Sequence, residues 1–103
     1  MRYTDDSLTL FLCTVQKEVG QAREKFPGNR HMMTALTEEV GELAQALIDD
    51  HRLQQGNAGG TIAREGSSMN VYMEAVQVAC MAARVALEGD ADFTYPDVLK
   101  TIK

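Results

Sequence analysis

The stretch Leu36-Thr-Glu-Glu-Val-Gly-Glu-Leu-Ala-Gln-Ala-Leu47 places an apolar residue at every third or fourth position. This series consists of Leu36, Val40, Leu43 and Leu47. Apolar residues at this spacing occupy one face of an α-helix. The pattern therefore predicts a helix from about Arg30 to Leu53, with the four apolar residues as its core stripe.

Similar series precede and follow this segment. One begins near Thr4 and predicts a first helix whose stripe is Leu8, Leu12, Val15, Val19, Ala22 and Phe26. The other spans roughly Ser67 to Leu87, closes at Gly89, and has the stripe Val71, Ala75, Val78 and Ala82. Because the alternation typical of strands is absent, the sequence predicts an all-α protein.

Proline and glycine mark the connections between these segments. Phe26-Pro27-Gly28-Asn29 is typical of a tight turn, and Gln54–Gly60 is polar and glycine-rich, as in a loop. Pro96 favours one short C-terminal helix. We therefore expect a single domain over residues 1–103, with three long helices and a short fourth one, forming a helical bundle.

Length and composition limit the classes of function. A chain of 103 residues builds one modest core, so we expect homo-oligomerisation to complete the bundle. The net charge of −5 argues against a nucleic-acid partner, because such proteins need basic surface, but it allows nucleotide binding through metal ions. No apolar run is long enough for a membrane span, and we expect no membrane partner. The two distant cysteines fit a reduced, cytoplasmic protein.

An internal correspondence singles out four oxygen-bearing side chains. A shift of 35 positions brings the second predicted stripe onto the third, Glu39 onto Glu74, and Glu42 onto Gln77. If the two helices form an antiparallel hairpin, these flanks can face each other. Three carboxylates and an amide oxygen would then suit Mg²⁺ or Mn²⁺. The alternative is that these glutamates line an ordinary solvated helix face.

The segment from Leu36 to Leu47 resembles the first signature of the MazG-like nucleoside triphosphate pyrophosphohydrolases. Glu74-Ala-Val-Gln-Val-Ala-Cys-Met-Ala-Ala-Arg84 is similar to the second signature of small members of that family, and Lys25-Phe26-Pro27 also resembles them. The resemblance covers most of Val15 to Asp90. The family pattern in the second signature is E-x-x-D, so Gln77 stands where an aspartate is expected.

The resemblance implies an all-α homodimer or homotetramer that hydrolyses a (deoxy)nucleoside triphosphate to the monophosphate and pyrophosphate. It implies Mg²⁺, with Mn²⁺ as an alternative, held by Glu39, Glu42, Glu74 and Gln77. The three glutamates would also be the catalytic residues. One of them, or a metal-bound water alone, would deprotonate the attacking water.

Two cations are candidates for substrate binding. Arg84 could neutralise the leaving pyrophosphate or could simply favour the dipole at the end of its helix. Lys25 could reach phosphates or could simply be solvated. Two other functions stay open: a non-enzymatic helical interaction module or degenerate relative, and an enzyme similar to phosphoribosyl-ATP pyrophosphohydrolases.

Overall fold

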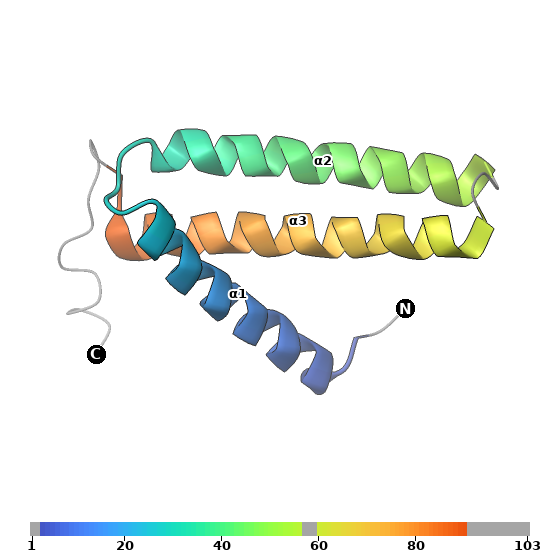
Figure 1. The fold of residues 1–103 in the computed structure, drawn as a ribbon, viewed down its shortest axis with the longest axis horizontal. Helices are drawn as coiled ribbons and strands as arrows, with labels where there is room; N and C mark the ends of the chain where they lie inside the picture. The colour runs from blue at the N-terminus through green and yellow to red at the C-terminus, as the bar shows by residue number, and fades with distance from the viewer. Residues whose placement is uncertain (1–2, 57–59, 91–103) are drawn as a thin grey trace.

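The computed structural model describes residues 3–56 and 60–90. Within them lie three helices, α1 (Asp5–Lys25), α2 (Met32–Gly56) and α3 (Gly60–Glu88), and no strand. The all-α prediction is therefore confirmed, whereas the short helix expected after Pro96 falls outside the described residues. α2 and α3 form an antiparallel hairpin, and α1 crosses α3 obliquely near the end of α3 (Figure 1). In this part of the chain no helix has the continuous apolar length needed to cross a bilayer.

Two helix ends follow the capping signals of the sequence. The side-chain oxygen of Thr4 accepts a hydrogen bond from the backbone N–H of Ser7 at 3.0 Å and so caps α1. After α3, Gly89 has a left-handed φ of 73°, and its N–H donates to the carbonyl of Val85. The start predicted near Thr4 and the end predicted at Gly89 are both confirmed.

The connection between α2 and α3 is shorter than predicted. The sequence pattern assigned Gln54–Gly60 to a loop and began the third helix at Ser67, but α2 continues to Gly56 and α3 begins at Gly60. A glycine costs a helix only about 1 kcal/mol relative to alanine, and residues 63–65 are good helix formers. Packing along the hairpin offsets that cost, so α2 includes Gly56, and α3 includes Gly60 and Gly66.

The inner face of α2 is rotated from the predicted stripe. Met32 and Ala46 are buried, whereas Val40 and Leu47 are 48% and 51% exposed. At about 100° per residue, the buried face is centred close to Glu39. This glutamate therefore lies at the seam between the helices rather than on the flank where the stripe placed it.

The predicted stripes of the other two helices also need correction. α3 packs against both α1 and α2, and its fully buried side chains are Val76, Cys80 and Arg84. Ala82, predicted to be in the core, is exposed. α1 packs only against α3 among the described helices, and Leu12 and Phe26 of its predicted stripe are exposed. Several apolar residues of these stripes thus stay exposed in the described part of the chain.

Candidate metal centre

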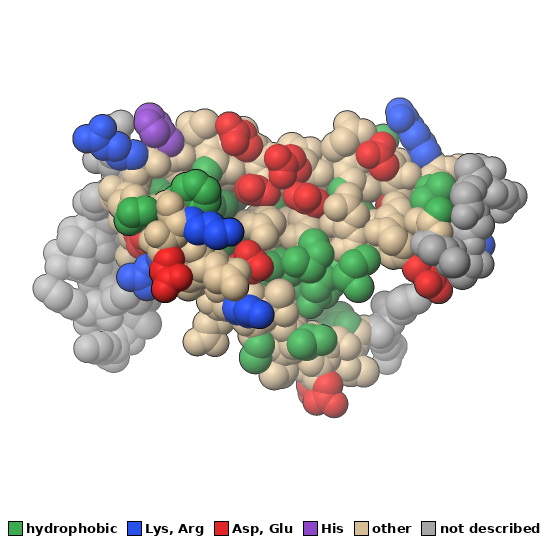
Figure 2. Space-filling view, viewed as in Figure 1, with side chains coloured by type: hydrophobic (Ala, Val, Ile, Leu, Met, Phe, Trp, Pro, Cys, Tyr) green, Lys and Arg blue, Asp and Glu red, His purple; other side chains and the backbone are tan. Residues whose placement is uncertain are grey.

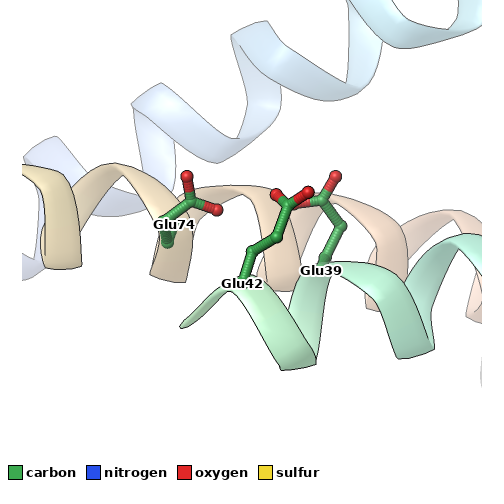
Figure 3. A group of neighbouring side chains, drawn as sticks. All are labelled: Glu39, Glu42 and Glu74. Atoms are coloured by element: carbon green, nitrogen blue, oxygen red, sulfur yellow. The ribbon is translucent and has the colours of Figure 1, made fainter. Parts of the chain in front are cut away.

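Three carboxylates converge where α2 and α3 run side by side. Glu39 and Glu42 come from adjacent turns of α2, and Glu74 comes from the facing part of α3 (Figure 3). One oxygen from each side chain lies within 4.8 Å of the oxygens of the other two. Acidic side chains gather along the middle of the hairpin on the face seen in Figure 2. The structure thus brings together the three glutamates that the 35-residue correspondence singled out.

Two members of this trio have an oxygen atom shielded from solvent. Glu39 Oε2 and Glu74 Oε2 have no hydrogen-bond partner among the described residues. A shielded carboxylate oxygen without a partner is costly, because it loses its hydration and gains nothing in return. A divalent cation would compensate both atoms at once. Glu42 is exposed, so the trio stays open to solvent on its side.

Burial and neighbouring negative charge together raise the pKa of two glutamates. Burial is the largest cause of the raised pKa of Glu39, and the negative charges of Glu42 and Glu74 add to it. Burial is also the largest cause of the raised pKa of Glu74, followed by the charge of Glu42. A bound cation would counter this effect, since it favours the ionised form of each carboxylate.

We expect these two groups to destabilise the metal-free protein as the pH rises. Their pKa in the folded state lies above the unfolded value of 4.5, so the folded state binds more protons between the two values. Their contribution to the free energy of unfolding therefore falls from pH 4.5 upward and is fully lost above the folded-state pKa. Urea unfolding in a chelator at pH values from 4.5 to about 8 measures this fall.

The variant Glu39→Gln/Glu74→Gln supplies the comparison, because its amides do not titrate. Its stability should fall less steeply with pH than that of the wild type over the same range. Equal slopes for the two proteins would contradict the assignment of the fall to this pair.

Gln77, the expected fourth ligand, has a contact that the sequence pattern did not predict. Its Nε2 donates a hydrogen bond to Glu18 Oε2 on α1 at 3.1 Å. Glu18 was missed because a glutamate within an amphipathic helix usually faces solvent. The available signal was its position between Val15 and Val19, which places it on the side of α1 that meets α3.

Arg84 is buried, and its guanidinium is occupied by partners within the chain. Its Nε donates to Glu88 Oε2 at 2.8 Å, and one NH2 group donates to the carbonyls of Phe26 at 2.8 Å and Gly28 at 3.2 Å. Arg84 thus fastens the turn after α1 to the end of α3. Asp49, which the 35-residue shift places at the position of Arg84, accepts a hydrogen bond from Gln45.

A cleft of about 610 Å³ opens beside the trio. Its walls come from the end of α1, the following turn, α2 and α3, and they include Phe26, Met32, Glu39, Gln77 and Met81. This volume is typical of small-ligand sites. Lys25 is exposed in the last turn of α1, directly before Phe26 in the cleft wall.

No protein-family model, curated protein or solved structure matches this chain.

Proposed function

We propose that this chain is a Mg²⁺-dependent hydrolase that converts (deoxy)nucleoside triphosphates to monophosphates and pyrophosphate, with Mn²⁺ as an alternative ion. The observation that carries the proposal is the convergence of Glu39, Glu42 and Glu74, two of which have a shielded oxygen without a partner. The resemblance of the segments around these residues to MazG-like pyrophosphohydrolases supports it. A cytoplasmic setting belongs to the same proposal.

The trio fits a hard divalent cation. Mg²⁺ prefers oxygen ligands at about 2.1 Å, so ligands on opposite sides of one ion lie about 4.2 Å apart. Oxygens already within 4.8 Å of one another need only a small adjustment to reach this spacing. When bound, the cation would neutralise charge on the phosphates and lower the pKa of water.

The chain itself supplies a base and room for a substrate. Water would attack the α-phosphorus, the bond to the bridging oxygen would break, and pyrophosphate would leave. One glutamate of the trio would accept the proton from water as a general base. The cleft beside Glu39 would hold the nucleoside. Lys25, which is exposed at the end of α1, would contact the phosphates. Arg84, which also lines this cleft, holds the turn in its wall in place.

A pyrophosphate-release assay across the eight common ribo- and deoxyribonucleoside triphosphates, with and without Mg²⁺, tests this function. We expect metal-dependent release from at least one of them. In water labelled with ¹⁸O, the label should appear in the monophosphate, because the attack is on the α-phosphorus.

Other outcomes favour other functions. Label in the pyrophosphate would contradict the proposed point of attack. Cleavage of phosphoribosyl-ATP without turnover of free triphosphates would favour the second enzyme class. Absence of metal-dependent release from every nucleotide would favour a helical interaction module.

The proposal includes a homodimer or homotetramer, because the hairpin leaves apolar surface uncovered. Met33, Val40 and Leu47 are all about half exposed and follow one another at intervals of seven residues along α2. Apolar residues at this interval are typical of helices that pack against another helix. Further apolar side chains are exposed in the angle between α1 and α3 (Figure 2).

We expect Val40→Glu to convert the oligomer to monomers, since it would place a charge in a packed helical seam. Sedimentation velocity should show the mass fall to that of the 11.3 kDa chain. Thr34→Glu is the matched control, because it adds the same charge at an exposed position on another side of α2. A wild-type protein that sediments as a monomer at high concentration would refute the oligomer.

A further inference from the structure

Glu18 and Gln77 form a polar link between α1 and α3. The hydrogen bond between them joins α1 to α3 across 59 positions of sequence and is partly buried. Elsewhere along the same pair of helices, Phe11 packs edge to face on Tyr72, with ring centroids 5.7 Å apart. α1 packs only against α3 among the described helices, so Glu18 reaches the neighbourhood of the trio through Gln77.

The chemistry of an amide fixes what this bond does to Gln77. An ionised carboxylate only accepts hydrogen bonds, so Glu18 can pair only with the nitrogen end of the amide. The oxygen end, Oε1, has no hydrogen-bond donor among the described residues. Gln77 lies one turn after Glu74 and lines the same cleft as Glu39. The amide oxygen is therefore the end left for that cleft, and it is a ligand type that Mg²⁺ accepts.

Glu18 also supplies a charge that position 77 lacks. In the 35-residue correspondence, Gln77 matches Glu42, so α3 contributes one carboxylate fewer than α2. The buried thiol of Cys80 lies near both Glu18 and Glu39: burial is the main cause of its raised pKa, the charge of Arg84 opposes the rise, and both carboxylates add to it. Carboxylates from α1 and α2 thus both lie near Cys80, which, like Gln77, is part of the cleft wall.

We propose that Glu18 is a positioning residue for the cation centre. It directs the amide oxygen of Gln77 toward the ion, and it contributes from α1 the negative charge that α3 lacks at position 77. This inference rests on the proposed function, because it requires a cation at Glu39, Glu42 and Glu74. Cation binding then depends on how α1 packs against α3, although α1 carries none of the three glutamates.

Binding of Mn²⁺, followed by electron paramagnetic resonance of the free ion, tests this role without reference to turnover. Glu18→Ala should weaken Mn²⁺ binding about tenfold, as loss of a partner behind a metal ligand commonly does. Glu18→Gln keeps a side chain of the same shape and should also weaken binding, because the charge is lost. Glu24→Ala removes a charge from an exposed position on another side of α1 and should bind Mn²⁺ as the wild type does.

The exchange Glu18→Gln/Gln77→Glu separates positioning from a merely structural role. It restores one amide and one carboxylate to the pair, so Mn²⁺ affinity should return to within about threefold of the wild type, which is less than 1 kcal/mol. Thermal unfolding of each metal-free variant checks that a variant with weaker Mn²⁺ binding is still folded.

Each outcome distinguishes the two proposals. Wild-type affinity in both Glu18→Ala and Glu18→Gln, or an exchange variant no better than Glu18→Gln, would overturn the role of Glu18 and leave the cation centre intact. A wild-type protein that binds no Mn²⁺ would overturn the proposed function, and the role of Glu18 with it.

Discussion

Glu42→Gln is expected to lower Mg²⁺-dependent pyrophosphate release about 100-fold or more while leaving the fold intact. Glu42 lies between Glu39 and Glu74 in the trio, and its charge is the one that acts on both of them. Its loss would weaken the hold on a cation that supplies several kcal/mol of transition-state stabilisation, and each 1.36 kcal/mol is a factor of ten. Because the side chain is exposed, the amide costs the fold little.

Asp49→Asn is the matched control for this variant. Asp49 lies seven residues further along the same side of α2, is exposed, and loses the same charge. It should keep wild-type turnover, and both variants should keep the wild-type circular dichroism spectrum. Full activity of Glu42→Gln, or equal losses in both variants, would remove Glu42 from the ligand set.

Arg84→Met is expected to lower the free energy of unfolding by about 3 kcal/mol. The Arg84 side chain is 3% exposed, and the substitution would leave two backbone carbonyls and the Glu88 carboxylate without their donor. Breaking a buried ion pair by removing one partner costs about 3–5 kcal/mol, and the partial exposure of Glu88 favours the lower end. For a chain of this size the melting temperature should fall by about 12 °C or more.

Urea unfolding of Arg84→Met, Arg84→Lys and Arg52→Met measures this effect. Lysine keeps the charge but lacks the planar fork that reaches a carboxylate and two carbonyls together, so it should recover only part of the stability. Arg52 is exposed on α2, and its replacement should change stability by less than about 0.5 kcal/mol. Equal stabilities of Arg84→Met and Arg52→Met would show that the buried guanidinium does not hold the turn.

The fold was largely predictable from sequence because its signals are local. Apolar spacing gave three helices, and the cap at Thr4 and the glycine at Gly89 gave two of their ends. The phase of each stripe was not predictable in the same way. α2 has apolar residues around Ala46 and around Val40, and only the packing of α3 decides which of these faces is buried within the chain.

The trio was predictable because both helices of the antiparallel hairpin carry an oxygen-bearing pair at the same level and on facing sides. The roles of Glu18 and Arg84 were not, since both depend on contacts between distant positions. Arg84 donates to main-chain carbonyls 56 and 58 positions away, and a carbonyl has no side-chain signature in the sequence. Glu18 acquires its partner only when α1 crosses α3, an arrangement that the spacing within α1 does not specify.

A crystal of the full chain grown with Mn²⁺, and measured for anomalous scattering, tests the shared cation most directly. A peak about 2.1–2.2 Å from an oxygen of each of Glu39, Glu42 and Glu74 is the expected result. The contradicting result would be an anomalous peak elsewhere, or no peak, in a crystal kept at a saturating concentration of Mn²⁺. In such a crystal the three side chains would point in separate directions.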